Sequence, residues 1–377
     1  MGQSIWNSMQ QKGYSRRDFL QFCAAAATVA GFGQSGVAQV VTAFEKKEKP
    51  AVVWLHFQEC TCCSESFIRA SHPVVLDVLL DVLNLNYTET LMAASGFQAE
   101  KCLTDTISNN KGKYIVLVEG AVPTKEDGVY CMIGGKTAES ILQTVAKDAA
   151  AVVAWGSCAS NGCVQAAKPN PTGATPIHKL VDKTVINVPG CPPNSYSLLS
   201  LILEYAAMHH MPALDAENRP KFAYDRLIHE HCPRRAHFDA GRFVNMFGDE
   251  GHRQGWCLYK MGCKGPVTHA PCSTLHFNEI PDVWPIGIGA PCVGCTERAT
   301  AFRTPMFQTV EIHAMTPPEA LPSVNAPAGK LSVAAGTTAG LIVGAVATAA
   351  VIATKRMPDG TKPEDDTKDK GIFLGGK

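Results

Sequence analysis

Five short apolar runs, rich in β-branched residues, alternate with longer stretches in the first half of the chain. The runs cover Ala51 to Phe57, Leu85 to Met92, Lys113 to Glu119, Ala151 to Trp155 and Thr184 to Val188. Stretches with helical spacing lie between them, such as those from Pro73 to Leu83 and from Thr137 to Asp148. Strands that alternate with helices predict a parallel sheet, and uninterrupted apolar strands indicate that helices cover both of its faces.

The second half of the chain loses this pattern. Beyond Met211 the apolar periodicity is poor, and Pro, Gly, His and Cys become frequent. A stretch with so weak a core normally needs disulfides or metal clusters to hold it together. We therefore predict an α/β protein with a parallel-sheet domain over residues 44–205 and a second, mostly irregular domain over residues 206–325 that metal organises.

The N-terminal segment resembles an export signal. A twin-arginine pair, Arg16-Arg17, precedes a modest apolar run from Phe22 to Phe32, the arrangement used to export proteins that have already folded around a cofactor. Small residues up to Ala43 suit a cleavage site after that residue. The pattern therefore predicts a twin-arginine signal peptide over residues 1–43. The alternative is a surface helix capped by Ser15.

A second apolar segment, Val333 to Thr354, lies near the C-terminus. It has 22 residues and no charged side chain, so a helix of about 33 Å could cross a bilayer core. Lys355 and Arg356 follow, and the positive flank is expected on the cytoplasmic side. The pattern predicts a linker and a single transmembrane anchor over residues 326–354 and a cytoplasmic tail over residues 355–377, with the bulk of the chain on the periplasmic side of the cell membrane. A buried helix is the alternative.

Composition directs attention to the cysteines. Lys plus Arg equals Asp plus Glu, 34 against 34, which argues against a polyanionic partner such as nucleic acid. The chain has 15 cysteines, far more than an ordinary soluble domain contains.

One cysteine set follows the ends of the predicted strands. Its members are Cys60, Cys62, Cys63, Cys158, Cys163 and Cys191. Ligands of open parallel sheets bind beyond the carboxyl ends of the strands, so these loops should converge on one site, together with Glu119 at the end of the third strand. A zinc site or a four-iron cluster normally takes four such ligands. Two additional thiolates make sense if they replace a bridging sulfide.

The remaining cysteines include two further sets. His229, Cys232, Cys257 and Cys263 would hold a four-iron cluster or a zinc ion. Cys272, Cys292 and Cys295 offer three thiolates, which suits a three-iron cluster. Of the other three, Cys23 lies in the predicted signal segment, and we predict that Cys102 and Cys131, which fall in the sheet domain away from these loops, are buried hydrophobic side chains.

Disulfides and structural zinc are the alternatives for an exported, cysteine-rich chain. The adjacent residues Cys62 and Cys63 cannot readily pair with each other, and export of a folded chain implies assembly in the reducing cytosol. Zinc would suit the set from His229 to Cys263 taken alone. Neither alternative explains six thiols at one site.

The motifs resemble those of the small subunits of nickel–iron hydrogenases, of the membrane-bound, oxygen-tolerant uptake type. They are Glu59-Cys60-Thr61-x-Cys63-x-Glu65, Gly156-Ser157-Cys158-Ala159, Pro189-Gly190-Cys191-Pro192-Pro193, His229-x-x-Cys232, Cys257-x5-Cys263 and Pro291-Cys292-x-Gly294-Cys295. They occur in the family order, and the resemblance runs from the signal to the anchor.

The resemblance implies a flavodoxin-like domain with a proximal iron–sulfur cluster and a second domain with a medial 3Fe-4S and a distal 4Fe-4S cluster. The nickel–iron centre would lie on a large-subunit partner and not in this chain. Electrons from hydrogen oxidation would pass through the three clusters to a membrane cytochrome b or another quinone-linked membrane protein. A non-catalytic periplasmic electron carrier, a hydrogen-sensor subunit and a quinone-reductase subunit are the alternatives.

Two positions depart from the common family pattern. Cys62 and Cys163 stand where glycine is usual, as in oxygen-tolerant members, whose proximal cluster is 4Fe-3S with six cysteine ligands. The cluster would be 4Fe-4S if these two residues do not bind it. The resemblance also implies that Glu119 is a ligand or proton acceptor when this cluster is over-oxidised; alternatively it is a strand-end residue that bonds backbone amides.

Overall fold

The computed structural model describes residues 4–29, 33–46, 48–70, 75, 78–208, 211–277 and 280–312. All of them belong to one compact unit that runs from Met1 to Pro318. The segment from Val333 to Thr354, where we predict a transmembrane anchor, lies outside the described residues, as do its linker and tail. Within the described residues, no helix has the length and apolar character needed to cross a membrane.

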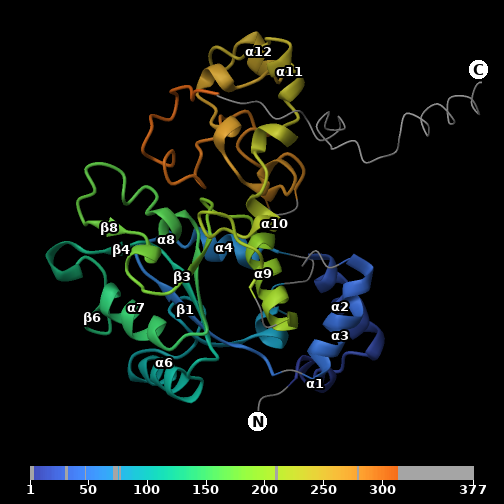
Figure 1. Ribbon diagram of the computed structural model, residues 1–377, viewed down its shortest axis with the longest axis vertical. Coiled ribbons are helices and arrows are strands. Elements are labelled where there is room, and N and C mark those ends of the chain that lie inside the picture. The colour runs from blue at the N-terminus through green and yellow to red at the C-terminus, as the bar shows by residue number, and fades with distance from the viewer. Residues whose placement is uncertain are drawn as a thin grey trace, which may run out of the picture. The chain divides into compact units, whose positions relative to one another are not determined.

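Five parallel strands form the central sheet (Figure 1). They are β1 (Ala51–His56), β2 (Asn84–Thr88), β3 (Ile115–Glu119), β7 (Ala151–Trp155) and β9 (Val185–Val188). Their order is β2-β1-β3-β7-β9, which is the order of flavodoxin-like sheets. The predicted parallel α/β sheet is therefore confirmed. The second strand was predicted to extend to Met92, but it ends at Thr88 because the chain turns there and brings the Glu89 carboxylate to the backbone N–H of His56, 3.1 Å away.

Both faces of the sheet are covered. In β1, Val52 and Trp54 belong to one buried cluster, and Val53 and Leu55 belong to the other. This alternation follows from the period of two in a β-strand. Because both sets of side chains are buried, the strand carries apolar residues at every position from Ala51 to Leu55.

Helices pack on both faces of the sheet. The helices α6 (Phe97–Asn109) and α7 (Ala138–Lys147) pack on one face, and α4 (Cys62–Ile68) and α9 (Ser195–Met208) pack on the other. Thr137 is the N-cap of α7, where its side chain accepts a hydrogen bond from the Ser140 N–H. Such a cap satisfies one of the N–H groups that a helix leaves free at its start.

The predicted signal segment is helical. The helices α1 (Ile5–Gln11), α2 (Arg16–Val29) and α3 (Gly33–Lys46) precede the sheet, and α2 and α3 pack against α9. The Ser15 hydroxyl accepts a hydrogen bond from the Asp18 N–H at the start of α2. Phe19 and Phe44 are buried in the core cluster beside α9. The helix α2 thus begins with the serine cap named as the alternative, although it is partly buried.

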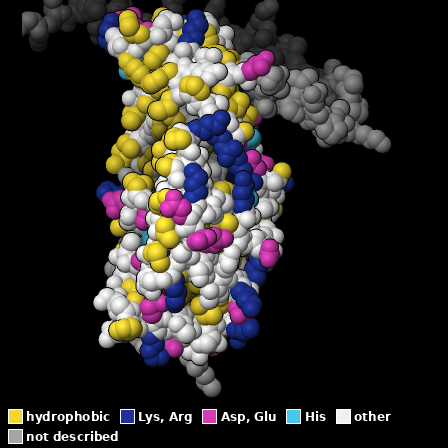
Figure 2. Space-filling model, turned by 90° about the vertical axis from the view of Figure 1, so that its left-hand side faces the viewer, with side chains coloured by type: hydrophobic (Ala, Val, Ile, Leu, Met, Phe, Trp, Pro, Cys, Tyr) yellow, Lys and Arg dark blue, Asp and Glu magenta, His cyan; other side chains and the backbone are white. Residues whose placement is uncertain are grey.

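Short helices and turns make up residues 211–312. They are α10 (Lys221–Tyr224), η4 (Ile228–His231), α11 (Arg235–Asp239), α12 (Glu250–Arg253), η5 (Tyr259–Met261), η6 (Gly265–Val267) and η7 (Pro271–Ser273). No strand of the sheets comes from the described part of this stretch. Its small apolar core includes Val244, Leu258 and Trp284. Figure 2 shows many apolar side chains at the surface on one side of the molecule.

Candidate iron–sulfur cluster sites

The register of the sheet brings the first cysteine set to one edge. His56 of β1 lies opposite Glu119 of β3, and Glu119 lies opposite Trp155 of β7. Trp155 in turn lies opposite Val188 of β9. The loops that carry the cysteines start directly after these positions, so the predicted convergence of the loops is present.

The six thiols of the first set lie close together. The Sγ atoms of Cys163 and Cys191 are 3.8 Å apart. Cys63 interacts electrostatically with Cys158, Cys191 and Cys60, and Cys60 interacts with Cys62. The structure therefore brings together all six members of the set.

Hydrogen bonds among these thiols favour the ligand form of two of them. The Cys163 thiol lowers the pKa of Cys191 to about 7 and lowers the pKa of Cys158 below its usual value. Burial raises the pKa of Cys60 to about 11. Metal ions bind the thiolate, so Cys158 and Cys191 are the members of the set that most readily supply it.

Backbone conformation at this edge leaves room for the sulfur atoms. A Cβ atom on Gly156 would collide with the Sγ atom of Cys63. Cys163 has a φ of 48°, in the left-handed region where glycine is favoured. A non-glycine residue in that region costs roughly 1–3 kcal/mol and is retained where the surrounding structure requires it.

Glu119 lies behind this edge of the sheet, fully buried. Its Oε1 atom accepts hydrogen bonds from the backbone N–H groups of Cys63 and Ser64, both at 3.2 Å. Its Oε2 atom accepts one from the Ser64 hydroxyl at 2.5 Å. Burial raises the pKa of Glu119, and the Ser64 hydroxyl opposes that rise. These contacts agree with the alternative prediction for Glu119, that of a strand-end residue that bonds backbone amides. They also connect Glu119 directly to Cys63, a predicted cluster ligand.

A group of polar side chains surrounds Glu119. The Nδ1 atom of His56 lies 3.6 Å from a carboxylate oxygen of Glu119 and 3.6 Å from one of Glu59. Sequence reasoning missed His56 as part of this site, although its place at the end of β1 was a usable signal. Glu89, bonded to the His56 backbone, has its pKa raised to about 7 by burial.

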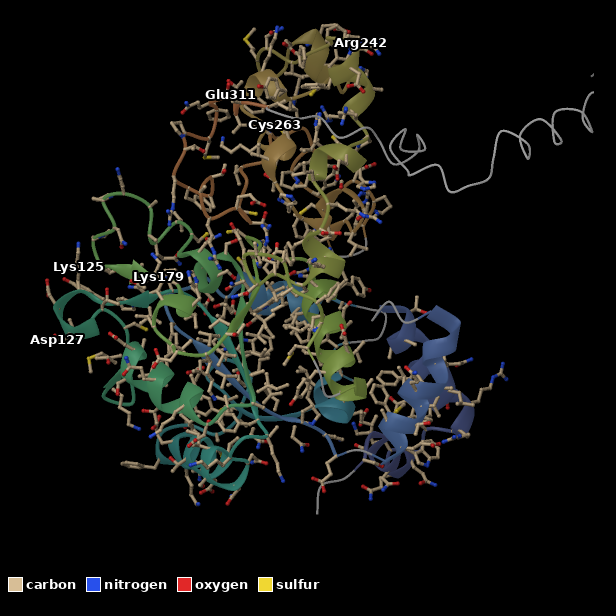
Figure 3. All side chains as sticks on the ribbon, in the orientation of Figure 1. Lys125, Asp127, Lys179, Arg242, Cys263 and Glu311 are labelled. Carbon is tan, nitrogen blue, oxygen red and sulfur yellow. The ribbon has the colours of Figure 1, made fainter. Side chains whose placement is uncertain are left out.

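The set that begins with His229 lines one cavity. Its walls include His229, Cys232, Cys257 and Cys263, and Figure 3 marks Cys263 among the short turns of this region. The Nε2 atom of His229 is buried and has no hydrogen-bond partner among the described residues. Burial lowers the pKa of His229 to about 4, so the imidazole is neutral and can act as a metal ligand.

The third set is also assembled. Cys272 interacts electrostatically with Cys292, and Cys295 interacts with Cys272. Burial raises the pKa of Cys272 to about 12. Gly294, between two members of the set, has a φ of 71°, and a Cβ atom there would lie 2.8 Å from Cγ2 of Thr300.

Hydrogen bonds join the three sets to one another. The Ser157 hydroxyl, next to Cys158, donates to the carbonyl oxygen of Cys295 at 2.6 Å. The backbone N–H of Lys264, next to Cys263, donates to the carbonyl oxygen of Cys292 at 2.8 Å. Sequence reasoning missed both contacts, and only the position of each residue beside a ligand could have suggested them.

The first set has more donors than a single ion uses, because tetrahedral zinc takes four ligands and this set has six thiols. Among the described residues, the one trio of potential ligands whose atoms all lie within 4.8 Å of one another is His56, Glu59 and Glu119, and no cysteine belongs to it. All 15 cysteines lie in the described part of the chain, where every one is free of disulfide bonds. A larger inorganic group suits such sets of unpaired thiols.

The cysteines outside the three sets differ in burial. Cys23, in the predicted signal segment, is buried. Cys102 and Cys131 are only partly buried, so the prediction of burial was wrong for them. Cys102 lies on α6, and Cys131 directly precedes the hairpin of β5 (Met132–Ile133) and β6 (Lys136–Thr137); both segments have exposed residues.

Two families match different parts of the chain. The family described as NADH ubiquinone oxidoreductase, 20 Kd subunit, matches residues 60–205. The family that describes the C-terminal part of the small subunits of NiFe/NiFeSe hydrogenases matches residues 224–308. The second match covers the irregular region and favours a hydrogenase over a quinone reductase.

Similar proteins extend over most of the chain. The Hydrogenase-2 small chain of Escherichia coli K12 is 44% identical over 95% of this chain and 96% of its own length. The uptake hydrogenase small subunit of Cupriavidus necator is 50% identical over 79% of this chain and 82% of its own. A chain of the [NiFeSe] hydrogenase structure from Desulfovibrio vulgaris Hildenborough has a TM-score of 0.61 and 34% identity over 67% of this chain and 95% of its own. The chain therefore belongs to the family of nickel–iron hydrogenase small subunits, as its motifs predicted, and is part of a hydrogenase.

Proposed function

We propose that this chain carries electrons between a hydrogen-splitting large subunit and an acceptor in the membrane. The observation that carries the proposal is the continuous series of ligand sets. Cys191 of the first set interacts electrostatically with Cys295 of the third, and Cys292 of the third set interacts with Cys263 of the second. When bound, iron–sulfur clusters at these sets would each accept and release single electrons.

The ligand assignment follows from the three sets. The proximal cluster would be held by Cys60, Cys62, Cys63, Cys158, Cys163 and Cys191, the medial 3Fe-4S cluster by Cys272, Cys292 and Cys295, and the distal 4Fe-4S cluster by His229, Cys232, Cys257 and Cys263. The buried, unpartnered nitrogen of His229 supports its place among the ligands. A neutral imidazole in place of a thiolate makes a cluster less negative and shifts its potential.

Oxygen tolerance is part of the proposal. Cys62 and Cys163 would give the proximal site six thiolates, as in a 4Fe-3S cluster. The left-handed backbone of Cys163 supports a specific role, because glycine would occupy that conformation without strain. Glu119 is bonded to the backbone N–H of Cys63, so its carboxylate is placed to receive a proton from that amide.

The chain requires a partner for this role. No nickel–iron centre is proposed within it, and the family name implies a large subunit that holds one. Exposed apolar residues support a partner: Met246 is 66% exposed and Ile288 is 70% exposed. Large apolar side chains at a surface are typical of interaction sites when they gather there. The membrane acceptor would be a cytochrome b or another quinone-linked membrane protein, with export by the twin-arginine route and a C-terminal anchor.

Purification with the large subunit tests the proposal. Affinity capture of this chain from anaerobically grown cells should recover a nickel-containing partner, and the complex should reduce a dye when supplied with hydrogen. A double variant, Cys257→Ala with Cys263→Ala, should keep the partner but lose most dye reduction. Recovery of the chain alone, without nickel or hydrogen-dependent dye reduction, would instead favour a separate electron carrier.

A further inference from the structure

A buried lysine lies between the second and third ligand sets. Lys264 is only 1% exposed, and it follows the ligand residue Cys263 directly. Its backbone N–H donates to the carbonyl oxygen of Cys292 at 2.8 Å. The aliphatic part of its side chain packs on Gly294, with Cβ and Cδ each 3.4 Å from the position of a Cβ atom there. Lys264 therefore contacts both cluster-binding regions.

Within the described part of the chain, every acceptor of the Lys264 ammonium group is a backbone carbonyl. Its acceptors are the oxygen atoms of Gly262 at 3.2 Å, Pro305 at 2.9 Å, Met306 at 3.0 Å and Gln308 at 3.4 Å. An ammonium group has three N–H donors and no acceptor, so four carbonyls around it suit the charged form. The cage also ties the segment around residue 306 to the turn that precedes Cys263.

Among the described residues, no carboxylate forms an ion pair with this ammonium group. A buried lysine is seldom without a counter-charge, because an isolated charge in the protein interior is unfavourable by several kcal/mol or more. The groups that interact electrostatically with Lys264 are the side chains of Cys292 and Cys263, one from each set, and each would carry negative charge as a cluster ligand.

We propose that Lys264 is the counter-charge shared by the medial and distal clusters, and that it raises the reduction potentials of both. The inference depends on the cluster assignment in the proposed function. A fixed positive charge stabilises the more negative, reduced state of a nearby redox group, and it does so strongly where water is excluded. Lys264 is thus a positioning residue through its backbone and a potential-setting residue through its side chain.

Redox titration of the complete heterodimer, followed by electron paramagnetic resonance, tests this role. Lys264→Met removes the charge and keeps much of the length, Lys264→Gln keeps N–H donors for the carbonyls, and Lys264→Arg keeps the charge. Lys260→Met is the matched control, because it removes an exposed lysine from the neighbouring turn η5. The medial signal is the readout, and activity is not required.

The expected result is a shift of the medial potential to more negative values in both neutral variants. At the potential that half-reduces the wild-type cluster, the ratio of oxidised to reduced cluster should rise at least tenfold, which is about 59 mV for one electron. Lys264→Arg and Lys260→Met should stay within about twofold of the wild type, or roughly 18 mV by the same relation.

Two outcomes would overturn the inference. One is an unchanged potential in Lys264→Gln with normal iron content. The other is loss of iron in the neutral variants while the clusters that remain keep wild-type potentials, which would show that the lysine only holds the fold. The absence of a three-iron signal in the wild type would contradict the cluster assignment itself and can be recognised separately.

Discussion

The hydroxyl of Ser157 donates a 2.6 Å hydrogen bond to the carbonyl oxygen of Cys295, which is 138 residues away in the sequence. The same Oγ atom accepts a hydrogen bond from the backbone N–H of Gly190 at 2.9 Å. One serine side chain therefore connects the loop of Cys158, the loop of Cys191 and the loop of the medial set. The contact joins the sheet domain to the irregular region at the point where the proposed electron path leaves the proximal site.

Ser157→Ala should slow electron passage between the proximal and medial sites, because it removes the contact that fixes the two loops relative to each other. We expect lower hydrogen-dependent dye reduction, whereas isotope exchange between hydrogen and water, which the proposed function assigns to the large subunit, should stay at the wild-type rate. The free energy of unfolding should fall by about 1–3 kcal/mol, since two buried backbone groups lose their partner.

Ser160→Ala is the control for this change. Its hydroxyl is buried on the same short helix, α8 (Ser157–Asn161), and donates to the carbonyl oxygen of Ala154 at 3.1 Å. It should lower stability by a similar amount and leave the ratio of dye reduction to isotope exchange unchanged. An equal change of that ratio in both variants would contradict the role of Ser157.

Cys62→Gly combined with Cys163→Gly should remove oxygen tolerance. Under nitrogen the double variant should retain hydrogen oxidation, because four thiolates suffice for a cubane cluster and glycine suits the backbone at position 163. In air, activity should fall far below that of the wild type. The measurement is film electrochemistry with pulses of oxygen, and Cys102→Ala is the control outside the cluster sites. Equal tolerance in the double variant and the wild type would exclude a special function for the two cysteines.

Glu89 should make stability depend on pH. Burial raises its pKa in the folded protein from 4.5 to about 7, so the folded state holds the proton more tightly than the unfolded state. This contribution to stability is complete below pH 4.5 and is lost as the pH rises through about 7. Glu89→Gln stays neutral at both pH values. From pH 5 to pH 8 its free energy of unfolding should therefore increase, relative to that of the wild type, by on the order of 2 kcal/mol.

Calorimetry of the anaerobic complex at pH 5 and pH 8 measures this difference. Glu126→Gln, on an exposed turn, is the control and should behave like the wild type at both pH values. If Glu89→Gln lowers the unfolding temperature equally at both pH values, the carboxyl does not titrate in this range and the assignment is wrong.

Replacement of Arg16 and Arg17 by lysine should block export. The precursor should accumulate in the cytoplasm with residues 1–43 still attached, and mass spectrometry of the mature wild type should give Phe44 as its first residue. Removal of residues 326–377 should release an active, exported heterodimer from the membrane. Normal processing of the lysine variant, or tight membrane attachment of the truncated chain, would contradict the respective proposals.

The sequence predicted those features that depend on local patterns. The strands are visible because each is short, apolar and followed by a loop, and their parallel arrangement places Cys60, Cys158 and Cys191 at one edge. The cysteines that follow His229 in the sequence likewise indicated a ligand set. Residue spacing was sufficient for these predictions, because strand direction determines where the loops emerge.

Contacts between distant loops could not be predicted in this way. The hydrogen bond from Ser157 to Cys295 and the carbonyl cage around Lys264 depend on how two regions pack, and no periodic pattern records such packing. The burial of Phe19 against α9 has the same origin. The early end of β2 at Thr88 also reflects a tertiary contact, because Glu89 turns toward His56 and leaves the strand.

The iron content of an intact, anaerobically prepared complex tests the central claim most directly. Three clusters bound by the sets around Cys158, Cys292 and Cys263 require about 11 irons per chain, with a three-iron signal in the oxidised protein. We expect both in the same preparation. Four irons or fewer per chain, without that signal, would contradict the account.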